Sequence, residues 1–318
     1  MPGESARLRL ATRGSALALA QARLVAGMLE GVEPSLRVEL VPVRTSGDER
    51  SDRGQTEPPS APGRGDKSRF VKEIEQVLLA GAADLAVHSA KDVPGELPSG
   101  LAIVGVPARA DPRDALCGTD SIAALPAGAR VGTSSLRRRA QLLAVRDDLE
   151  VGELRGNVDT RLRRLGEGDY DAVVLALAGL ERLGLRAGEP VDPAVMTPAP
   201  GQGCLALEAR TGDARVAYLA AAVTDADALV ALTAERAVTA TLEASCDTPI
   251  GVHAELTGGD DSELTVTSFV GRPDGTAWLR DAVGGDAQAP AELGRLAGER
   301  LVSAGAADVL GGEEVKRS

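Results

Sequence analysis

Six consecutive residues near position 90 combine side chains that could carry out acid–base or electrostatic chemistry. They follow a short, mainly apolar run, Asp84–Val87, which is typical of a buried strand. Pro94 prevents a helix from forming across them, and open α/β sheets bind ligands at the carboxyl ends of their strands. The pattern predicts a functional turn at a strand end, although a solvated polar loop also fits these residues alone. The side chains concerned are His88, Ser89, Lys91 and Asp92.

A second group of candidate residues is the arginines between positions 130 and 165. This segment holds nine arginines, five acidic residues and no lysine, in a chain whose formal net charge is −12. Arginine without lysine favours planar, bidentate recognition of carboxylate or phosphate. For Arg146, Arg163 and Arg164 a solvated helix face is the simpler interpretation. The nine are Arg130, Arg137, Arg138, Arg139, Arg146, Arg155, Arg161, Arg163 and Arg164.

Arg137 and Arg138 differ from the rest because they lie one turn inside a predicted helix. Hydroxyl residues from Thr133 to Ser135 precede that helix, so backbone N–H, hydroxyl and guanidinium groups converge there. Arg155 stands before Gly156 at a predicted strand end, where the backbone can approach a ligand closely.

Arg13 and Ser15 occupy the corresponding position near the N-terminus. We therefore expect two sheet edges to bind one polycarboxylate or phosphorylated ligand in a shared cleft. Surface arginines usually affect stability by at most about 0.5 kcal/mol. Substitution of Arg137 or Arg155 is accordingly expected to weaken ligand binding with little loss of stability.

Three cysteines and two histidines supply the remaining candidates. Cys117 and Cys204 lie in apolar or glycine-rich surroundings typical of packing residues. Cys246 lies in a loop with small neighbours, where a reactive thiol and an ordinary loop cysteine fit equally well. No His/Cys cluster has the spacing of a metal site, so no metal is expected.

Composition limits the class of protein. The 318 residues are 43% hydrophobic and 26% charged, which indicates a globular protein of two or three domains. Aromatic content of 2% and the negative net charge oppose nucleic-acid binding. We expect no membrane span and no signal peptide, and the odd cysteine count favours the cytoplasm.

The elements that must position these residues alternate between strand and helix, which predicts α/β domains with mainly parallel sheets. The strand from Cys204 to Glu208 is expected to return to the first domain. A meander and a helix after Ile250 predict a small α+β domain. The expected boundaries are 1–107 with 203–221 for domain 1, 112–197 for domain 2 and 225–318 for domain 3.

Seven motifs follow one another along nearly the whole chain: Leu10–Ser15, Gly65–Glu73, Val87–Pro94, Val131–Arg138, Leu154–Leu162, Pro200–Gly203 and Cys246–Gly251. Taken together and in this order, they resemble the porphobilinogen deaminase (hydroxymethylbilane synthase) family, although Ala244 and Ser245 replace a glycine-rich lead to the cysteine.

The resemblance implies an enzyme that joins four porphobilinogen molecules head to tail, releases ammonia and yields hydroxymethylbilane. It implies two α/β domains like those of periplasmic binding proteins and a small α+β C-terminal domain. We also expect a monomer. Cys246 would hold a dipyrromethane cofactor through a thioether, and Asp92 would be the catalytic carboxylate. Cofactor contacts would come from Ser89, Lys91, Thr133, Ser135, Arg137, Arg138 and Gly156, and substrate contacts from Arg13, Ser15, Arg155, Arg161 and Arg182.

Two other functions fit parts of the pattern. One is a two-lobed carboxylate-binding protein without catalysis, which the Lys91–Asp92 pair and the missing signal peptide oppose. The other is a cysteine-dependent hydrolase using His88 or His253, for which nothing local gives support.

Overall fold

The structure is a computed structural model that describes residues 6–43, 67–245, 247–257 and 262–311, with the backbone alone for 67–70. The chain divides into two compact units, 1–110 with 204–229 and 111–203 with 230–318. The sequence predicts a long loop from Thr45 to Lys67. Its residues 45–66 lie outside the described residues, as does Cys246.

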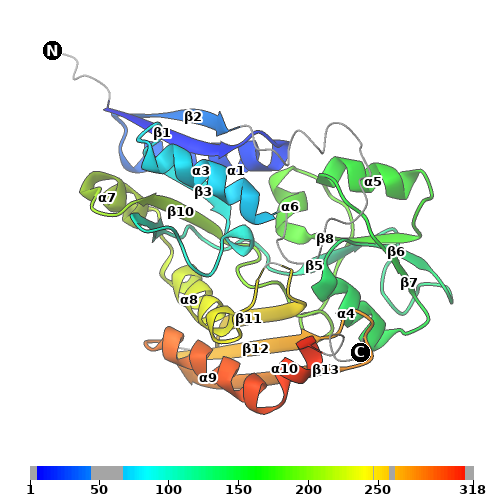
Figure 1. The fold of residues 1–318 in the computed structure, drawn as a ribbon. Coiled ribbons are helices and arrows are strands. Elements are labelled where there is room, and N and C mark those ends of the chain that lie inside the picture. The colour runs from blue at the N-terminus through cyan, green and yellow to red at the C-terminus, as the bar shows by residue number, and fades with distance from the viewer. Residues whose placement is uncertain (1–5, 44–66, 246, 258–261, 312–318) are drawn as a thin grey trace, which may run out of the picture. The chain divides into compact units, whose positions relative to one another are not determined.

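The helices and strands follow one another in the order labelled in Figure 1. The strands are β1 Ala6–Arg13, β2 Leu36–Val43, β3 Leu85–Ser89, β4 Leu101–Gly105, β5 Asp114–Cys117, β6 Arg130–Gly132, β7 Glu150–Gly152, β8 Ala172–Ala176, β9 Glu189–Pro190, β10 Leu205–Arg210, β11 Ile250–Thr257, β12 Glu263–Gly271 and β13 Trp278–Asp286. The helices are α1 Ala16–Val32, α3 Lys67–Leu79, α4 Leu136–Val145, α5 Val158–Gly166, α6 Leu177–Arg182, α7 Ala214–Ala222, α8 Ala226–Thr241, α9 Pro290–Ser303 and α10 Ala306–Gly311, with the 3-10 turn η1 Ala90–Asp92.

The first unit is built on a five-stranded sheet of order β2-β1-β3-β10-β4. Strands β1, β2 and β3 are parallel, and β10 pairs antiparallel with both β3 and β4. Alternation along the strands gives two buried faces. Leu10, Leu85 and Leu207 join the core under α1 and α7, while Ala11 and Ala86 face α3.

The second unit contains a sheet of the same kind, with order β7-β6-β8-β5-β9. Here β6 is parallel to β7 and β8, and β5 runs antiparallel between β8 and β9. In both sheets, therefore, the first three strands in spatial order are parallel and the fourth is antiparallel.

A three-stranded antiparallel sheet, β11-β12-β13, completes the second unit. Helices α8 and α9 cover it through a separate core that includes Val238, Val266 and Leu293. This sheet and its helices form the predicted α+β part. The fold class of α/β sheets plus a small α+β region is confirmed, while the three domain boundaries stay a prediction.

The strand β10 returns to the sheet of the first unit, as expected from the sequence. Strands β5 and β9 were not predicted, because four and two residues carry too little periodicity. The sequence predicts the last strand of the meander at Ala277–Leu279, but β13 runs from Trp278 to Asp286. Its side chains alternate between half-buried and exposed, so it shows no continuous apolar run.

No single helix in the described part of the chain is long and apolar enough to cross a membrane, although α7 and α8, bent by 109°, pass that test as a pair.

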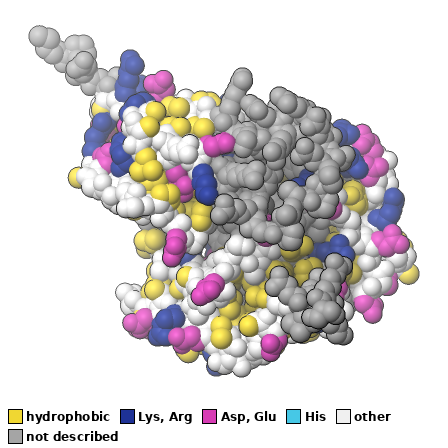
Figure 2. All heavy atoms as spheres, viewed as in Figure 1, with side chains coloured by type: hydrophobic (Ala, Val, Ile, Leu, Met, Phe, Trp, Pro, Cys, Tyr) yellow, Lys and Arg dark blue, Asp and Glu magenta, His cyan; other side chains and the backbone are white. Residues whose placement is uncertain are grey.

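On the face drawn in Figure 2, acidic and basic side chains of the described residues are interspersed.

Candidate active site

The turn that carries Lys91 and Asp92 lies at the carboxyl end of β3. The 3-10 turn η1 begins directly after Ser89. The backbone N–H of Ala90 donates to the carbonyl of Cys204 at 3.1 Å, and that of Val93 donates to the carbonyl of Ala90 at 3.1 Å. Lys91 and Asp92 are half-buried. The predicted placement of both residues at a strand end is confirmed.

Ser89 ends β3, and its hydroxyl oxygen accepts a hydrogen bond from Nε2 of Gln21 at 2.9 Å. Gln21 is buried on α1. The hydroxyl hydrogen of Ser89 is a separate donor, so the residue can be fixed by Gln21 and still donate to a ligand.

Arg13 and Ser15 lie at the same edge of this sheet, because β1 runs parallel to β3. Arg13 is the last residue of β1 and is half-buried. Ser15 is the N-cap of α1, where its Oγ accepts from the N–H of Ala18 at 3.3 Å. The hydroxyl of Ser15 therefore serves the helix, which the sequence did not indicate.

The corresponding edge of the second sheet has the same construction. Strand β6 ends at Gly132, and Ser135 is the N-cap of α4, accepting from the N–H of Arg138 at 3.5 Å. The N–H of Ser135 donates to Oγ1 of Thr133 at 3.2 Å. The predicted hydroxyl residues do gather at the helix start.

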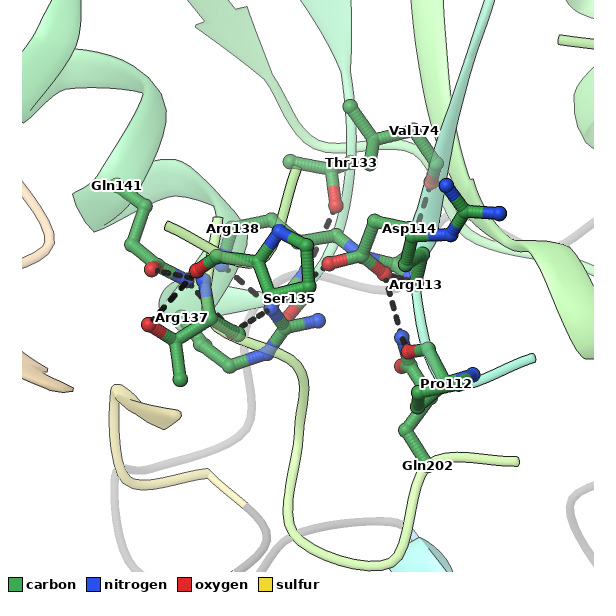
Figure 3. Close-up of polar contacts among 12 residues, drawn as sticks. Pro112, Arg113, Asp114, Thr133, Ser135, Arg137, Arg138, Gln141, Val174 and Gln202 are labelled. Carbon is green, nitrogen blue, oxygen red and sulfur yellow. Dashed lines mark hydrogen bonds and ion pairs between the residues drawn. The ribbon is translucent and has the colours of Figure 1, made fainter. Parts of the chain in front are cut away.

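The side chains of Arg137 and Arg138 point inward to a buried carboxylate (Figure 3). Nη1 of Arg137 lies 2.8 Å from Oδ2 of Asp114. Nε and Nη2 of Arg138 donate to Oδ1 of Asp114 at 3.0 and 2.8 Å. Nε2 of Gln202 donates to the same Oδ1 at 2.9 Å and to the carbonyl of Pro112 at 2.7 Å.

Burial alone would raise the pKa of Asp114, but Arg137 and Arg138 outweigh it and hold that pKa well below its usual range. Asp114 is 0% exposed and Arg137 is 4% exposed. The expectation that Arg137 is a surface arginine is therefore wrong. Sequence spacing placed it correctly at the helix start, but did not show that a carboxylate lay beneath.

The two arginines differ in what they can still offer a ligand. Nε, Nη1 and Nη2 of Arg138 donate to Asp114 and to the carbonyl of Val174. Nη1 of Arg137 donates to Asp114 and to the carbonyl of Thr197 at 2.6 Å. Nε of Arg137 is buried and has no hydrogen-bond partner among the described residues. A bound carboxylate would satisfy this donor.

Arg155 and Gly156 form the next anion-binding candidate, after β7. The Arg155 side chain is 70% exposed and its Nε lies 2.6 Å from Oε1 of Glu153. Gly156 has φ of +110°, a conformation that favours glycine. Nε of Arg161 donates to the Gly156 carbonyl at 2.8 Å. Arg155 is free to reorient, whereas Arg161 supports the turn.

Arg182, the last residue of α6, donates from Nη2 to the carbonyl of Gly203 at 2.6 Å. Arg163 and Arg164 pair with Glu167 and Asp169 on the exposed face of α5, which confirms the solvated-face interpretation for them. Arg146 does not fit it fully, because its Nη1 also donates to the carbonyls of Ile122 and Leu125.

Cys117 and Cys204 are buried and neither is in a disulfide, as predicted for packing residues. Burial raises the pKa of the Cys117 thiol to about 11, which disfavours a nucleophilic role. Cys246 lies outside the described residues.

The residues beside Cys246 form a hydrogen-bonded turn. The N–H of Ser245 donates to Oγ1 of Thr248 at 2.9 Å, and the N–H of Thr248 donates to the carbonyl of Ser245 at 3.0 Å. Glu243 has φ of +50°. The chain thus makes its sharp bend just before Ala244 and Ser245, which replace the expected glycines.

Sequence reasoning missed three buried polar residues: Asp114, Gln202 and Glu208. Asp114 stands at the start of an apolar strand, and Glu208 stands inside one. A carboxylate at such a position needs a buried partner, and this was the available signal. Among the described residues, no group of three or more His, Cys, Asp or Glu side chains could hold a metal ion.

Comparisons with known proteins agree on one family. The family model "Porphobilinogen deaminase, dipyromethane cofactor binding domain" matches residues 8–218, and "Porphobilinogen deaminase, C-terminal domain" matches residues 229–303. A porphobilinogen deaminase of Syntrophobacter fumaroxidans is 46% identical over 315 residues, covering 98% of each chain. One of Roseiflexus castenholzii is 47% identical over 309 residues, covering 96% of this chain and 99% of its own.

Among solved structures, the methionine binding protein MetQ is 14% identical, with a TM-score of 0.42, covering 67% of this chain and 87% of its own. This likeness is too low to add to the argument.

Proposed function

The chain belongs to the porphobilinogen deaminase family, and on that premise we propose how its residues carry out the reaction. The enzyme is a transferase of tetrapyrrole (haem) biosynthesis. It joins four porphobilinogen molecules head to tail, releases ammonia at each step and gives the linear product hydroxymethylbilane after hydrolysis.

The observation that carries the catalytic assignment is the position of Asp92. Its turn is fixed by backbone hydrogen bonds at the carboxyl end of β3, beside Lys91. Loss of ammonia from porphobilinogen leaves an electron-poor azafulvene whose pyrrole nitrogen carries positive charge. A carboxylate held at that nitrogen stabilises the charge where it develops. We assign this role to Asp92.

The arginines bind the carboxylates of the substrate and the growing chain. Each pyrrole brings an acetate and a propionate, so charge accumulates as units are added and a cationic site is required. We assign this role to Arg155, which is exposed, and to Arg13, the last residue of β1. Arg161 and Arg182 complete the set. Guanidinium groups meet carboxylates in paired hydrogen bonds, which fix orientation as well as charge.

The cofactor of the family is dipyrromethane, and the residues present fit it. The buried Nε of Arg137 has no partner among the described residues, the hydroxyl of Ser89 can still donate, and Thr133 and Ser135 lie at a helix start. Lys91, Arg138 and Gly156 complete the proposed set. When bound through Cys246, dipyrromethane supplies the pyrrole carbon to which the first substrate unit is joined.

We further propose a monomer in the cytoplasm, divided into domains 1–107 with 203–221, 112–197 and 225–318. The odd number of cysteines supports a reducing compartment. The net charge of −12 supports a small-molecule substrate over nucleic acid.

Intact-mass measurement tests the assignment of the cofactor. The purified protein should exceed its sequence mass by one dipyrromethane, and Cys246→Ser should fold but show the bare mass, because a hydroxyl is a far weaker nucleophile. Cys204→Ser is the matched control and should keep the added mass. An adduct on Cys117 or Cys204, with Cys246 unmodified, would overturn the assignment, and a bare wild-type mass would favour a binding protein or hydrolase.

A further inference from the structure

Three ionisable side chains lie inside the first unit, below the turn that carries Asp92. They are His88 on β3, Glu208 on β10 and Glu75 on α3, and each is at most 6% exposed. The proposed reaction uses none of them. Buried ionisable groups need partners, because transfer of an uncompensated charge out of water is costly.

The sheet register brings His88 and Glu208 together. Ala206 pairs with His88 and Glu208 pairs with Ala86, so His88 and Glu208 are diagonal neighbours on one face. Nε2 of His88 lies 2.9 Å from Oε2 of Glu208. Helix α3 packs on this face through Ile74 and Leu78, with Glu75 between them in sequence.

The charges of this trio do not balance if both carboxylates are ionised. A cationic His88 with ionised Glu75 and Glu208 leaves one net negative charge in apolar surroundings. Oε1 of Glu75, both carboxylate oxygens of Glu208 and Nε2 of His88 make no hydrogen bond among the described residues, so His88 and Glu208 are paired by proximity alone, at 2.9 Å. One additional proton makes the trio neutral, and pairing of Glu208 with His88 leaves Glu75 as its site.

The charged groups that act on Glu75 leave its pKa raised. Burial raises the pKa of Glu75, and the Glu208 carboxylate raises it further, against smaller opposing effects of His88 and of Lys72 on the same helix. Lys72 is exposed. Extending the β1–β3 register places Arg13 beside His88, at the edge of the sheet.

The trio lies directly behind the catalytic turn. His88 is followed by Ser89 and then by Ala90, where η1 begins. On the opposite side the Ser89 hydroxyl is held by Gln21. The end of β3 is therefore fixed through His88 on the face that α3 covers and through Ser89 on the α1 side.

We propose that Glu75, His88 and Glu208 form a proton-sharing trio in which Glu75 is un-ionised and the His88–Glu208 pair fixes the end of β3, which makes His88 a positioning residue for Asp92. The role in positioning Asp92 rests on the proposed function. The protonation of Glu75 does not.

The experiment compares Glu75→Gln and Glu208→Gln with the wild type. The matched control is Glu39→Gln, because Glu39 is an exposed residue of β2. Infrared spectra should show the carbonyl band of an un-ionised carboxylic acid in the wild type and in Glu39→Gln, and its loss in Glu75→Gln. Single-turnover ammonia release, on protein verified by mass to carry cofactor, should fall about tenfold or more in Glu208→Gln with KM nearly unchanged. Glu75→Gln should stay within about twofold of the wild type, because the amide resembles the un-ionised acid.

Persistence of the acid band in Glu75→Gln, or a wild-type rate in Glu208→Gln, would overturn the proposal. Where Glu208→Gln does not accumulate as folded protein, His88→Gln tests the same pair with both carboxylates retained. A wild-type protein that releases no ammonia from porphobilinogen would instead refute the proposed function, and the infrared result would still decide the state of Glu75.

Discussion

Both five-stranded sheets have an antiparallel fourth strand, and in both this strand carries a carboxylate that is 0% exposed. Asp114 on β5 meets two guanidinium groups and the amide of Gln202. Glu208 on β10 meets one imidazole and stands near a second carboxylate, Glu75. The negative charge of the buried carboxylate on the fourth strand is therefore compensated by two arginines in the second sheet and, in our proposal, by His88 and a shared proton in the first.

We expect this difference to affect two properties of the protein, its overall stability and the dependence of that stability on pH. Fully paired Asp114 should contribute mainly to stability, because removal of a partner leaves an uncompensated buried charge. The Glu75–His88–Glu208 trio should instead make the first unit sensitive to pH. Substitutions at the two carboxylates can test whether the two sheets differ in this way.

The largest expected effect is on the second sheet. Asp114→Asn should lower the free energy of unfolding by about 3–5 kcal/mol, because Arg137 and Arg138 would lose their buried counter-ion. Chemical denaturation measures this. Asp111→Asn is the matched control, since Asp111 pairs with Arg113 nearer the surface, and should change stability by at most about 1 kcal/mol. Equal losses of unfolding free energy in the two variants would contradict a larger contribution from the buried Asp114 than from the more exposed Asp111.

Substitutions of two arginines at the edge of the second sheet should affect stability and ligand binding differently. Arg137→Leu should lose about 3 kcal/mol, because Arg138 still pairs with Asp114. Arg155→Leu should stay within about 0.5 kcal/mol of the wild type, since its partner Glu153 is also exposed. Thermal unfolding with parallel KM measurement distinguishes them. A stable Arg137→Leu would restore the surface interpretation drawn from the sequence.

A smaller effect is expected on the first sheet, as a dependence on pH. The raised pKa of Glu75 means that the folded chain keeps this proton to higher pH than the unfolded chain. Its contribution to stability is complete below the unfolded pKa of about 4.3 and is lost as pH rises through the folded pKa. Glu75→Gln should not show this loss, so its stability relative to the wild type should increase with pH by at most about 1.4 kcal/mol per unit. Parallel stability curves across pH would contradict an un-ionised Glu75.

Acid should act in the opposite sense on Asp114, whose pKa is lowered by its arginines. Its contribution is present above the unfolded pKa of about 3.9 and is lost as pH falls through the folded value. Wild-type protein should therefore lose stability more steeply than Asp114→Asn below that pH, as followed by unfolding at a series of acidic pH values.

The sequence located the turn that carries Asp92 because an apolar run followed by Pro94 leaves few alternatives to a strand end. It located the start of α4 because hydroxyl residues, among them the N-cap Ser135, precede it. It did not show where the Arg137 and Arg138 side chains point. Both arginines meet a carboxylate more than 20 residues earlier in the chain, a pairing that depends on the placement of β5 beside β8.

The trio in the first sheet was also not predictable from local pattern. Glu75 fits an amphipathic helix, and Glu208 is one carboxylate inside an apolar strand. Only the register of β10 against β3 brings Glu208 to His88. The roles of Asp92 and Cys246 came from the family resemblance rather than from spacing.

Single-turnover ammonia release by Asp92→Asn tests the catalytic assignment most directly. The amide keeps size and hydrogen bonding but removes the charge, so the rate should fall by about 10²–10³ or more in protein verified by mass to carry cofactor. Asp92→Glu, which keeps the charge but displaces it, should retain more activity than Asn. Both variants should unfold at nearly the wild-type temperature. An Asp92→Asn enzyme that turns over near the wild-type rate would remove Asp92 from catalysis.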